Sequence, residues 1–415
     1  MKFKKNAYFL KSNALGSING MSLNSNKSFF SLLNLLTLSA TLIVCFGAIV
    51  VYSAVLNDSE YSFWRQLLGI AIGVVLMLLC WRIDYRILSN MIWPILFVTV
   101  FLIMSPHIPG LGVSVKGAQS WIKLGIQIQP AEFAKITVIF LCSSCVSRYQ
   151  GRLDNVVEYI KCLSIMLIPF VCIMTQPDLG TGLVYLFIAT IALIAGGANL
   201  RFLITTLILC IIFLILILVA DEMLKYTTES GNTEYHFLKT YQRQRLFVFI
   251  DPDNDTSDSG YNLKQAQIAI GSGGFFGKGL FNGTQAALKY LPEAPTDFIF
   301  CVLAEEFGFL GVIFLLILYA ILIKISLSIS KQCDELFGKM LIMCVIGMWV
   351  FQIFENIGMT CGLMPITGIP LPFISYGSSF MIVNFVMLGI IGSIANNSVV
   401  VKRKRIEYGS TRGLK

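Results

Sequence analysis

The sequence has little charge and almost no histidine, and both shortages limit what the protein can be. Only 13% of its residues are charged, about half the usual share for a soluble domain, while 56% are hydrophobic. The mean hydropathy is +0.76. A chain of this composition is a polytopic membrane protein. His107 and His236 are the only histidines, which argues against a histidine-based zinc site and a histidine-containing catalytic triad.

The sequence also lacks cysteines in polar loops and a phosphate-binding loop. Its 11 cysteines lie almost entirely in apolar runs, so we interpret even the CxxC of Cys142 and Cys145 as packing residues. The GSGGFFGKG segment, 271–279, lacks the G-x-x-x-x-G-K-[ST] spacing, because Gly279 stands at the hydroxyl position. We interpret it as flexible turns at the membrane surface. The aspartates of 251–258 lack the glycine and glutamate of a calcium loop and indicate a solvated turn.

Apolar runs long enough to cross a bilayer recur along the whole chain. Ten lie at about 29–55, 64–81, 87–105, 129–147, 160–174, 180–197, 202–220, 298–323, 338–362 and 370–395. We therefore predict an all-α polytopic membrane protein of about ten transmembrane helices, with one long extracytoplasmic loop, 221–296, between spans seven and eight. The predicted division is a cytoplasmic tail 1–28, a membrane domain 29–398 and a basic cytoplasmic tail 399–415.

The distribution of Lys and Arg predicts the orientation. With a cytoplasmic N-terminus, 20 of the 31 basic residues lie on the inner side and ten on the outer side, and seven of those ten lie in the long 221–296 loop. Long loops contribute little to topology, so the short loops favour two cytoplasmic termini. Topology thus explains the net charge of +8, and we predict no nucleic-acid partner.

Acidic side chains at membrane depth are concentrated on one side of this topology. The outer halves of the spans and the turn after the fifth span contain six acids, namely Glu132, Asp178, Asp297, Glu305, Glu306 and Glu355. Intramembrane carboxylates are costly and usually functional, so their shared depth predicts a polar cavity open to the outer leaflet. The alternative is a set of separate ion pairs that hold helices together, as Glu132 and Lys135, three residues apart, could do.

Three further stretches point to the same side. Residues 106–128 have alternating apolar side chains and indicate an interfacial segment, in which Trp121 by itself is typical of an interfacial aromatic. Arg243 and Arg245 form a short basic run that could hold a phosphate. The three prolines of 364–372 exclude an uninterrupted helix, and broken backbone at membrane depth needs protein or a wet cavity beside it.

Eight motifs carry a family resemblance. They are KGAQSW at 116–121, QPAEFAK at 129–135, QPDLGTG at 176–182, YQRQR at 241–245, GYNLKQAQIAIGSGGFFGKG at 260–279, GTQ at 283–285, LPEAPTDFIFCVLAEEFGFLG at 291–311 and GIPLPFISYGSS at 368–379. In this order they resemble the SEDS family (shape, elongation, division and sporulation), and its RodA branch in particular. The chain departs from the family pattern at Ala131, Pro295 and Ser378, which replace Ser, His and Gly, and in a longer 221–240 segment.

The resemblance implies a peptidoglycan glycosyltransferase in the bacterial cytoplasmic (inner) membrane. The implied substrate is lipid II, a disaccharide-peptide on undecaprenyl pyrophosphate in the outer leaflet. The implied partners are a class B penicillin-binding protein, which is a transpeptidase, and other membrane proteins of the elongation complex. The family's essential acid maps to Asp297, and other family site positions map to Trp121, Glu132, Lys135 and Asp178.

The chemistry of such a reaction assigns roles that the sequence leaves partly open. A pyrophosphate donor needs one base for the acceptor hydroxyl and a cationic clamp for the leaving group. Asp297 fits either the base or a ligand of a divalent cation, Mg²⁺ or Mn²⁺. Arg243, Arg245 and Lys278 are candidate pyrophosphate contacts. The alternatives are a lipid II flippase, which would need polar groups in both membrane halves, and a non-catalytic scaffold for a penicillin-binding protein, which would not need Asp297.

Overall fold

The computed structural model describes residues 31–56, 58, 60–115, 118–124, 126–176, 178–227, 233–234, 248–249 and 258–412. In these residues, eight helices are long and apolar enough to cross a membrane. They are Ser31–Val55, α2 (Phe63–Arg82), α4 (Pro130–Ser147), α5 (Val156–Ile173), α7 (Leu200–Met223), α11 (Ile299–Gln332), α12 (Leu336–Thr360) and α13 (Ser378–Arg412, apolar as far as Ser398). The prediction of an all-α polytopic membrane protein is confirmed.

Two shorter apolar helices occupy the places of two further predicted spans. They are α3 (Ile92–Met104, extended by the 3-10 turn η2 to His107) and α6 (Leu179–Ala195). Each has fewer than the 18 residues of a full crossing helix, so the number of ten spans stays a prediction.

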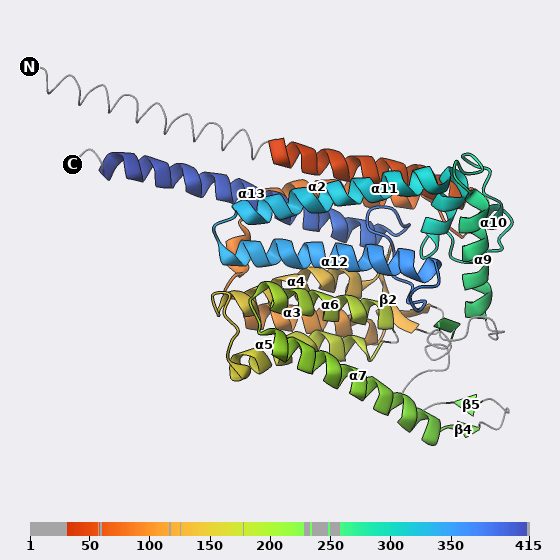
Figure 1. Ribbon diagram of the computed structural model, residues 1–415, viewed down its shortest axis with the longest axis horizontal. Coiled ribbons are helices and arrows are strands. Elements are labelled where there is room, and N and C mark those ends of the chain that lie inside the picture. The colour runs from red at the N-terminus through yellow and green to blue at the C-terminus, as the bar shows by residue number, and fades with distance from the viewer. Residues whose placement is uncertain are drawn as a thin grey trace, which may run out of the picture.

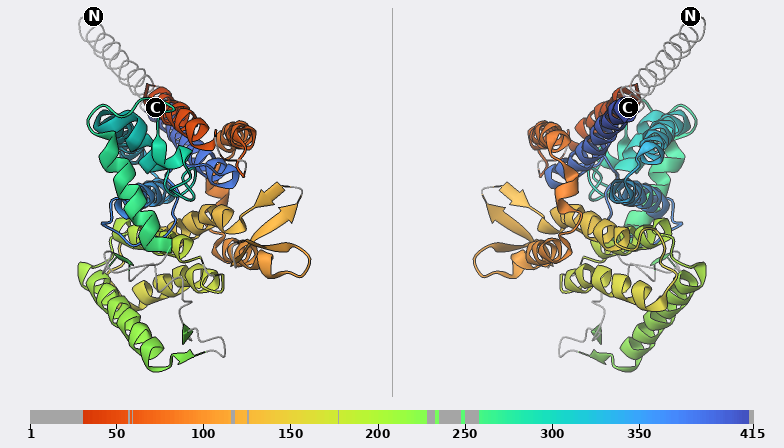
Figure 2. Two further views of the ribbon diagram at one scale, coloured as in Figure 1. Left: turned by 90° about the vertical axis from the view of Figure 1, so that its right-hand side faces the viewer. Right: turned by 90° about the vertical axis from the view of Figure 1, so that its left-hand side faces the viewer.

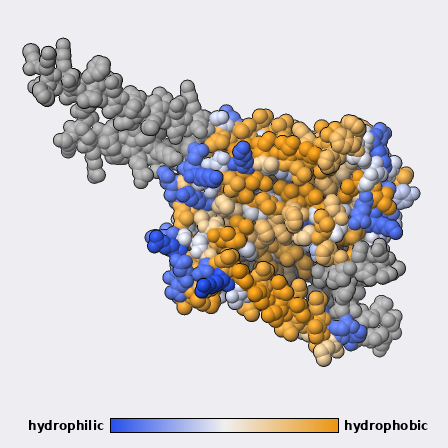
Figure 3. Space-filling model, in the orientation of Figure 1, coloured by the Kyte–Doolittle hydropathy of each residue, from blue (hydrophilic) through white to orange (hydrophobic). Residues whose placement is uncertain are grey.

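Successive helices run in alternating directions, so their connections gather at two ends (Figure 1). We call one the far end; it holds the short connections 83–91, 148–155, 196–199 and 333–335. We call the other the site end; it holds the described residues of 56–62, 105–129, 174–178, 224–298 and 361–377. Between them, on the face shown in Figure 3, the surface is mostly hydrophobic with hydrophilic residues toward both ends, as expected for a protein that lies across a bilayer.

Glycines let α2 and α13 lie in direct contact. A Cβ added to Gly73 would come within 2.5 Å of the Phe385 ring, and one added to Gly389 within 2.5 Å of the Met77 carbonyl oxygen. Small residues allow this close approach between membrane helices, where lipid tails remove most of the hydrophobic driving force. The packing fixes the first turn of α13 and, with it, the chain that enters this helix.

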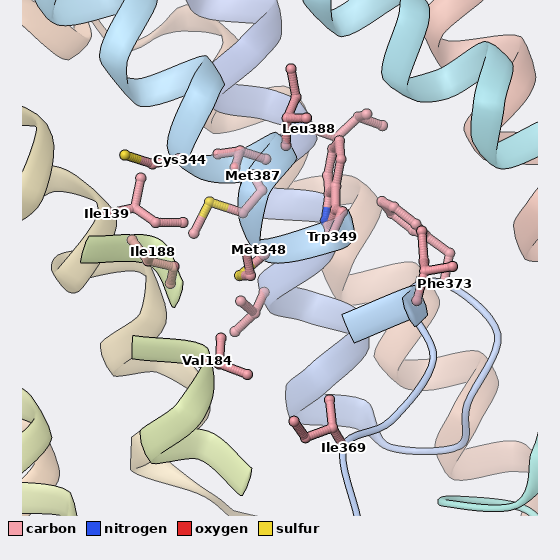
Figure 4. Packing of buried hydrophobic residues seen from close by; sticks show 14 of the residues in the cluster. Ile139, Val184, Ile188, Cys344, Met348, Trp349, Ile369, Phe373, Met387 and Leu388 are labelled. Carbon is pink, nitrogen blue, oxygen red and sulfur yellow. The ribbon is translucent and has the colours of Figure 1, made fainter. Parts of the chain in front are cut away.

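The centre of the bundle is a core of apolar side chains from α4, α6, α12 and α13 (Figure 4). Trp349 is fully buried there, with its ring centroid 5.5 Å from that of Phe373. Its indole nitrogen donates a 2.8 Å hydrogen bond to Asn384 Oδ1. A buried indole N–H needs such a partner, and this bond holds α12 to α13.

The segment 361–377, which we call the broken segment, is not helical. The predicted tenth span, 370–395, was placed too early, because α13 begins at Ser378. Prolines lack the N–H that a helix interior needs, and Pro370 and Pro372 lie in this stretch. The broken segment is nevertheless buried at many positions. It packs against the first helix, where a Cβ on Gly47 would lie 2.8 Å from the Ile374 Cα.

The described residues of 112–128 form a small antiparallel sheet, which their alternation of apolar side chains allows but which we did not predict. The strands are β1 (Gly112–Val115), β2 (Ala118–Leu124) and β3 (Ile126–Ile128), in the order β1-β2-β3. The sheet projects sideways from the bundle beside α3 (Figure 2).

The described part of the connection between α7 and α11 lies at the site end. It contains β4 (Tyr226–Thr227), β5 (Thr233–Glu234), α9 (Asp258–Gly273) and the short α10 (Thr284–Ala287). Helix α9 runs across the ends of the spanning helices (Figure 1). Helix α7 diverges from the bundle, and no residue in its most apolar part is buried.

Candidate active site

Asp297 lies in a tight turn immediately before α11, as its position in the sequence predicted. The backbone N–H groups of Thr296, Asp297 and Phe298 all donate to the Glu293 carbonyl oxygen, over 3.2, 3.1 and 3.3 Å. Asp297 itself is half-buried. We call residues 293–298 the Asp297 turn. Its backbone bonds hold the carboxylate at the entrance of a spanning helix.

The broken segment is bonded to the Asp297 turn at two points. The Asn356 side-chain amide, on α12, donates 2.8 Å bonds to the carbonyl oxygens of both Asp297 and Ile369. The Tyr376 N–H donates to the Pro295 carbonyl oxygen over 2.9 Å. Pro295, one of the departures from the family pattern, therefore contributes a backbone acceptor that does not depend on its side chain.

Tyr61 and Glu293 form a contact that the sequence analysis missed. The Tyr61 hydroxyl donates to Glu293 Oε2 over 2.6 Å, and the Thr296 hydroxyl donates to the same oxygen over 3.1 Å. Burial, followed by the hydrogen bond and the negative charges of Glu293, Asp297 and Asp58, raises the Tyr61 pKa well above its ordinary value. The hydroxyl thus stays protonated and donating. No local sequence signal points to this contact, because the two residues are 232 positions apart.

Glu132 and Lys135 form a buried ion pair in the first turns of α4. Lys135 Nζ lies 2.6 Å from Glu132 Oε1, and the side chains are 2% and 6% exposed for the lysine and the glutamate. Lys135 Nζ is also 5.4 Å from the centre of the Phe380 ring, in the first turn of α13. Burial at this level makes the pair costly unless each charge is matched, so it must be maintained as a unit.

Asp178 caps α6 and ties it to α4. Its carboxylate accepts from the Thr181 N–H at 3.0 Å and the Thr181 hydroxyl at 2.8 Å, and from the Gln129 amide at 3.1 Å. A Cβ on Gly180, two residues on, would lie 2.9 Å from the Thr367 carbonyl oxygen. The start of α6, which Asp178 caps, therefore lies against the broken segment at Thr367, and the Asp297 turn is bonded to the same segment at Tyr376.

Lys278, which we predicted as a candidate pyrophosphate contact, is paired with a buried carboxylate. Its Nζ is 2.5 Å from Glu305 Oε1, and Glu305 is fully buried. The same carboxylate accepts from the Thr284 N–H at 2.9 Å and the Thr284 hydroxyl at 2.8 Å. The structure thus places Lys278 in a bond between α11 and the segment that leads into α10, where its charge is matched by Glu305.

Of the stretch 271–279, which we predicted as flexible turns, the first three residues end α9, and the turns that follow are bonded to α11. The Lys278 and Gly279 N–H groups donate to the carbonyl oxygens of Glu305 and Glu306, over 2.9 and 3.0 Å. These carbonyls are accessible because α11 is interrupted at Gly308, whose φ of 63° and ψ of −163° are not helical. A positive φ of this kind suits glycine alone, so the break is built into the sequence.

The remaining predicted site residues are only partly described. Trp121 is half-buried in β2 and pairs with Val113 of β1. Arg243 and Arg245 lie outside the described residues.

Buried charge is confined to the site end. Among the described residues, the buried charged side chains are Glu132, Lys135, Asp221, Glu305, Glu306 and Glu355. All lie in the halves of their helices nearest the site end. In the same part of the chain, one buried oxygen each of Glu132 and Glu306 and both polar atoms of Gln352 have no hydrogen-bond partner among the described residues. Polar atoms of this kind normally bind water or a ligand.

Comparison with known proteins identifies the family. A family model for cell cycle proteins of the FtsW, RodA and SpoVE type matches residues 28–399. The chain belongs to this family. The match spans almost all of the described bundle, and it confirms the resemblance drawn from the eight motifs.

Relatives named MrdB and FtsW are similar to this chain along most of its length. The peptidoglycan glycosyltransferase MrdB of Escherichia coli strain K12 is 34% identical, over 86% of this chain and 93% of its own. The probable peptidoglycan glycosyltransferase FtsW of Trichlorobacter lovleyi is 32% identical, over 87% of this chain and 92% of its own.

A solved structure of the family shares the fold. A chain from a peptidoglycan synthase complex, described as coordinating polymerization and crosslinking, superposes with a TM-score of 0.71 at 26% identity. The match covers 88% of this chain and 97% of that one.

The Asp297 turn fits a divalent cation only if the substrate completes the site. Among the described residues, no three His, Cys, Asp or Glu side chains are grouped as a metal site. Mg²⁺, however, is often held by one or two carboxylates together with substrate phosphates. Asp297 supplies one such carboxylate, while that of Glu293 accepts hydrogen bonds from Tyr61 and Thr296. This donor set suits a cation that binds with a pyrophosphate.

Proposed function

We propose that this protein polymerises lipid II into glycan strands as a peptidoglycan glycosyltransferase. The observation that carries the proposal is the one-sided site: Asp297 is fixed at the mouth of α11 beside buried charged groups that occur, among the described residues, only at this end. Family membership supports the reaction class, because similar relatives carry that enzyme name. A flippase would need polar groups in both halves, and this distribution does not favour it.

In the proposed reaction, a sugar hydroxyl of one chain attacks the anomeric carbon of another. The new glycosidic C–O bond forms, the bond to the phosphate oxygen breaks, and undecaprenyl pyrophosphate leaves with the electron pair. Asp297 accepts the proton of the attacking hydroxyl. In the alternative role that stays open for Asp297, its carboxylate would instead hold a Mg²⁺ or Mn²⁺, which would supply positive charge for the leaving pyrophosphate. Arg243 and Arg245 remain candidate pyrophosphate contacts, whereas Lys278 is engaged by Glu305.

We further propose a role in cell elongation, with a class B penicillin-binding protein as partner and other elongation-complex proteins around it. The GSGGFFGKG and GTQ motifs support a role in elongation rather than division, although a relative named FtsW and a relative named MrdB both match the chain. The similar chain from a peptidoglycan synthase complex supports a partner that crosslinks the product.

The test of the proposed activity is reconstitution. Purified protein in detergent or liposomes is incubated with lipid II and Mg²⁺ or Mn²⁺, and the glycan products are separated on a gel. We expect a ladder of polymers from the wild type and none from Asp297→Asn. A wild type that is folded and gives no polymer, with its penicillin-binding protein present, would contradict the proposal and favour a scaffold role.

The proposed location is the cytoplasmic membrane, with both termini inside and the site end outside. A cysteine introduced at Lys289, which is exposed beside α10, should react with an impermeant thiol reagent in intact cells. One introduced at Asp334, exposed at the far end, should react only after the cells are opened. The unmodified chain provides the background from its native cysteines, and the reverse pattern would overturn the orientation.

A further inference from the structure

Residues 61–66, at the start of α2, contact both segments that form the site. The Tyr61 hydroxyl bonds Glu293 in the Asp297 turn, and its ring lies edge-on to Tyr376 of the broken segment, with centroids 5.1 Å apart. The Tyr376 hydroxyl in turn donates to the Ser62 carbonyl oxygen over 3.2 Å. Tyr61 is therefore placed between the two segments and not merely beside one of them.

Gln66 extends this connection into α2. Its amide nitrogen donates to the Ser375 carbonyl oxygen over 3.3 Å, and its amide oxygen accepts from the Gly377 N–H over 3.0 Å. Gln66 is 1% exposed, so both of its polar groups depend on these partners. The broken segment is thus bonded to α2 through Gln66, and Tyr61, which precedes this helix, is bonded to Glu293 of the Asp297 turn.

The backbone of Glu293 indicates that the turn needs outside support. Its φ is +57°, in the left-handed region that side chains other than glycine rarely adopt. Strained conformations of this kind persist where surrounding contacts hold them. The Glu293 side chain accepts hydrogen bonds from Tyr61 and Thr296, and the Tyr61 contact comes from a distant part of the sequence.

We propose that Tyr61 and Glu293 are positioning residues, whose hydroxyl–carboxylate bond sets the place of Asp297 relative to the broken segment. The inference rests on the proposed function and adds to it a control of geometry by the connection between the first two spanning helices. Neither residue needs to touch the substrate. Without the Tyr61–Glu293 bond, the backbone of Asp297 should stay bonded, but the position of its carboxylate should be less restricted. Displacements of about 1 Å can cost up to about 100-fold in rate.

The first experiment compares Tyr61→Phe with a matched change at the other end of the molecule. Tyr61→Phe removes the hydroxyl and keeps the ring against Tyr376. The control is Tyr85→Phe, because the Tyr85 hydroxyl donates to Glu335 Oε2 over 2.8 Å between two far-end connections. We expect Tyr61→Phe to lower kcat about tenfold with little change in KM. We expect Tyr85→Phe to keep the wild-type kcat.

A double mutant tests whether the two residues act as one unit. Glu293→Leu, which removes the acceptor, should resemble Tyr61→Phe, and the double variant should be no slower than the slower single, because both changes remove the same bond. A Tyr61→Phe kcat within twofold of the wild type overturns the proposal. So does an equal loss in Tyr85→Phe, since this would mark a general effect of losing a Tyr–Glu bond.

A second readout does not require polymerisation. Asp297→Cys is made with Tyr61 and with Tyr61→Phe, and its rate of reaction with a small thiol reagent is measured against the chain that keeps Asp297. We expect the rate to change severalfold when the hydroxyl is lost, because the turn is less constrained. An unchanged rate overturns the positioning role, even if the wild type proves to make no polymer. Absence of polymer with a changed rate would instead count against the proposed function alone.

Discussion

The two ends of the bundle solve the same problem of joining helices, but with different kinds of residue. The far end uses short connections, and its main polar cluster is partly exposed: Arg86 and Glu335 form a 2.7 Å ion pair with side chains 34% and 35% exposed. The site end uses the broken segment, a strained turn and buried charged pairs. Its Glu132–Lys135 pair is at most 6% exposed.

This difference distinguishes polar groups that only join helices from polar groups that form a functional site. Charged groups at a water-facing margin cost little, because solvent compensates them whether or not they pair. Buried charges carry a desolvation penalty that good pairing only offsets. The far end shows that the fold can turn its chain without them. Their confinement to one end therefore marks the site, and variants at the two ends should behave differently.

The largest difference is expected between Asp297→Asn and Glu335→Gln. Asp297→Asn keeps the shape and the backbone bonds of the turn but removes the base and the metal-binding charge, so polymerisation should fall by at least about 100-fold. Glu335→Gln, at the far end, should leave the rate near that of the wild type. Glycan yield per insertion-competent molecule is the measurement. Wild-type-like polymer from Asp297→Asn would remove Asp297 from the chemistry.

The buried pair in α4 should show the next largest effect. Glu132→Gln or Lys135→Met alone leaves one buried charge without its partner, which typically costs about 3–5 kcal/mol of stability. The double variant removes both charges and should recover much of the stability and part of the activity. Thermal unfolding and polymerisation are measured on all three. If the double is no more active than the worse single, both side chains act directly on the substrate.

The Lys278–Glu305 pair should affect stability more than chemistry. Lys278→Met leaves the buried Glu305 carboxylate with its Thr284 and backbone donors, and the expected loss is about 1–3 kcal/mol. The control is Lys225→Met. It breaks the 2.5 Å ion pair of Lys225 with Glu222, whose two side chains are 49% and 47% exposed. We expect almost no change in stability from this control. A loss of polymerisation in Lys278→Met without loss of stability would return Lys278 to the pyrophosphate contacts.

The sequence predicted those parts of the fold and site that depend on local pattern. Long apolar runs determine the spanning helices, because every backbone group in a membrane must be satisfied within the helix. The prolines of the broken segment predicted interrupted backbone, though not that α13 would begin only at Ser378. The position of Asp297 before an apolar helix needed no tertiary information.

The sequence could not predict the contacts between distant segments. Tyr61 and Glu293 are 232 positions apart, and neither has a neighbour that indicates the other. The sequence showed Lys278 as a free cation because its partner, Glu305, lies 27 positions away. The two are brought together where Gly308 interrupts α11. Local pattern cannot show which of many polar groups will be buried together, and that pairing decides whether a charge is structural or available to a substrate.

The smallest effect is expected at Arg86, and it tests the exposed side of the comparison. Arg86→Gln removes the ion pair with Glu335 but leaves the Tyr85 hydroxyl on that carboxylate. Since both side chains are about one-third exposed, water replaces most of what is lost, and stability should fall by less than about 1 kcal/mol. Added salt should shrink even this difference, because the pair is within reach of screening ions. The measurement is thermal unfolding of wild type and variant at low and high salt, with polymerisation unchanged in both. A loss as large as that of Lys135→Met would mean that polar contacts at the far end are as important to this protein as those at the site end.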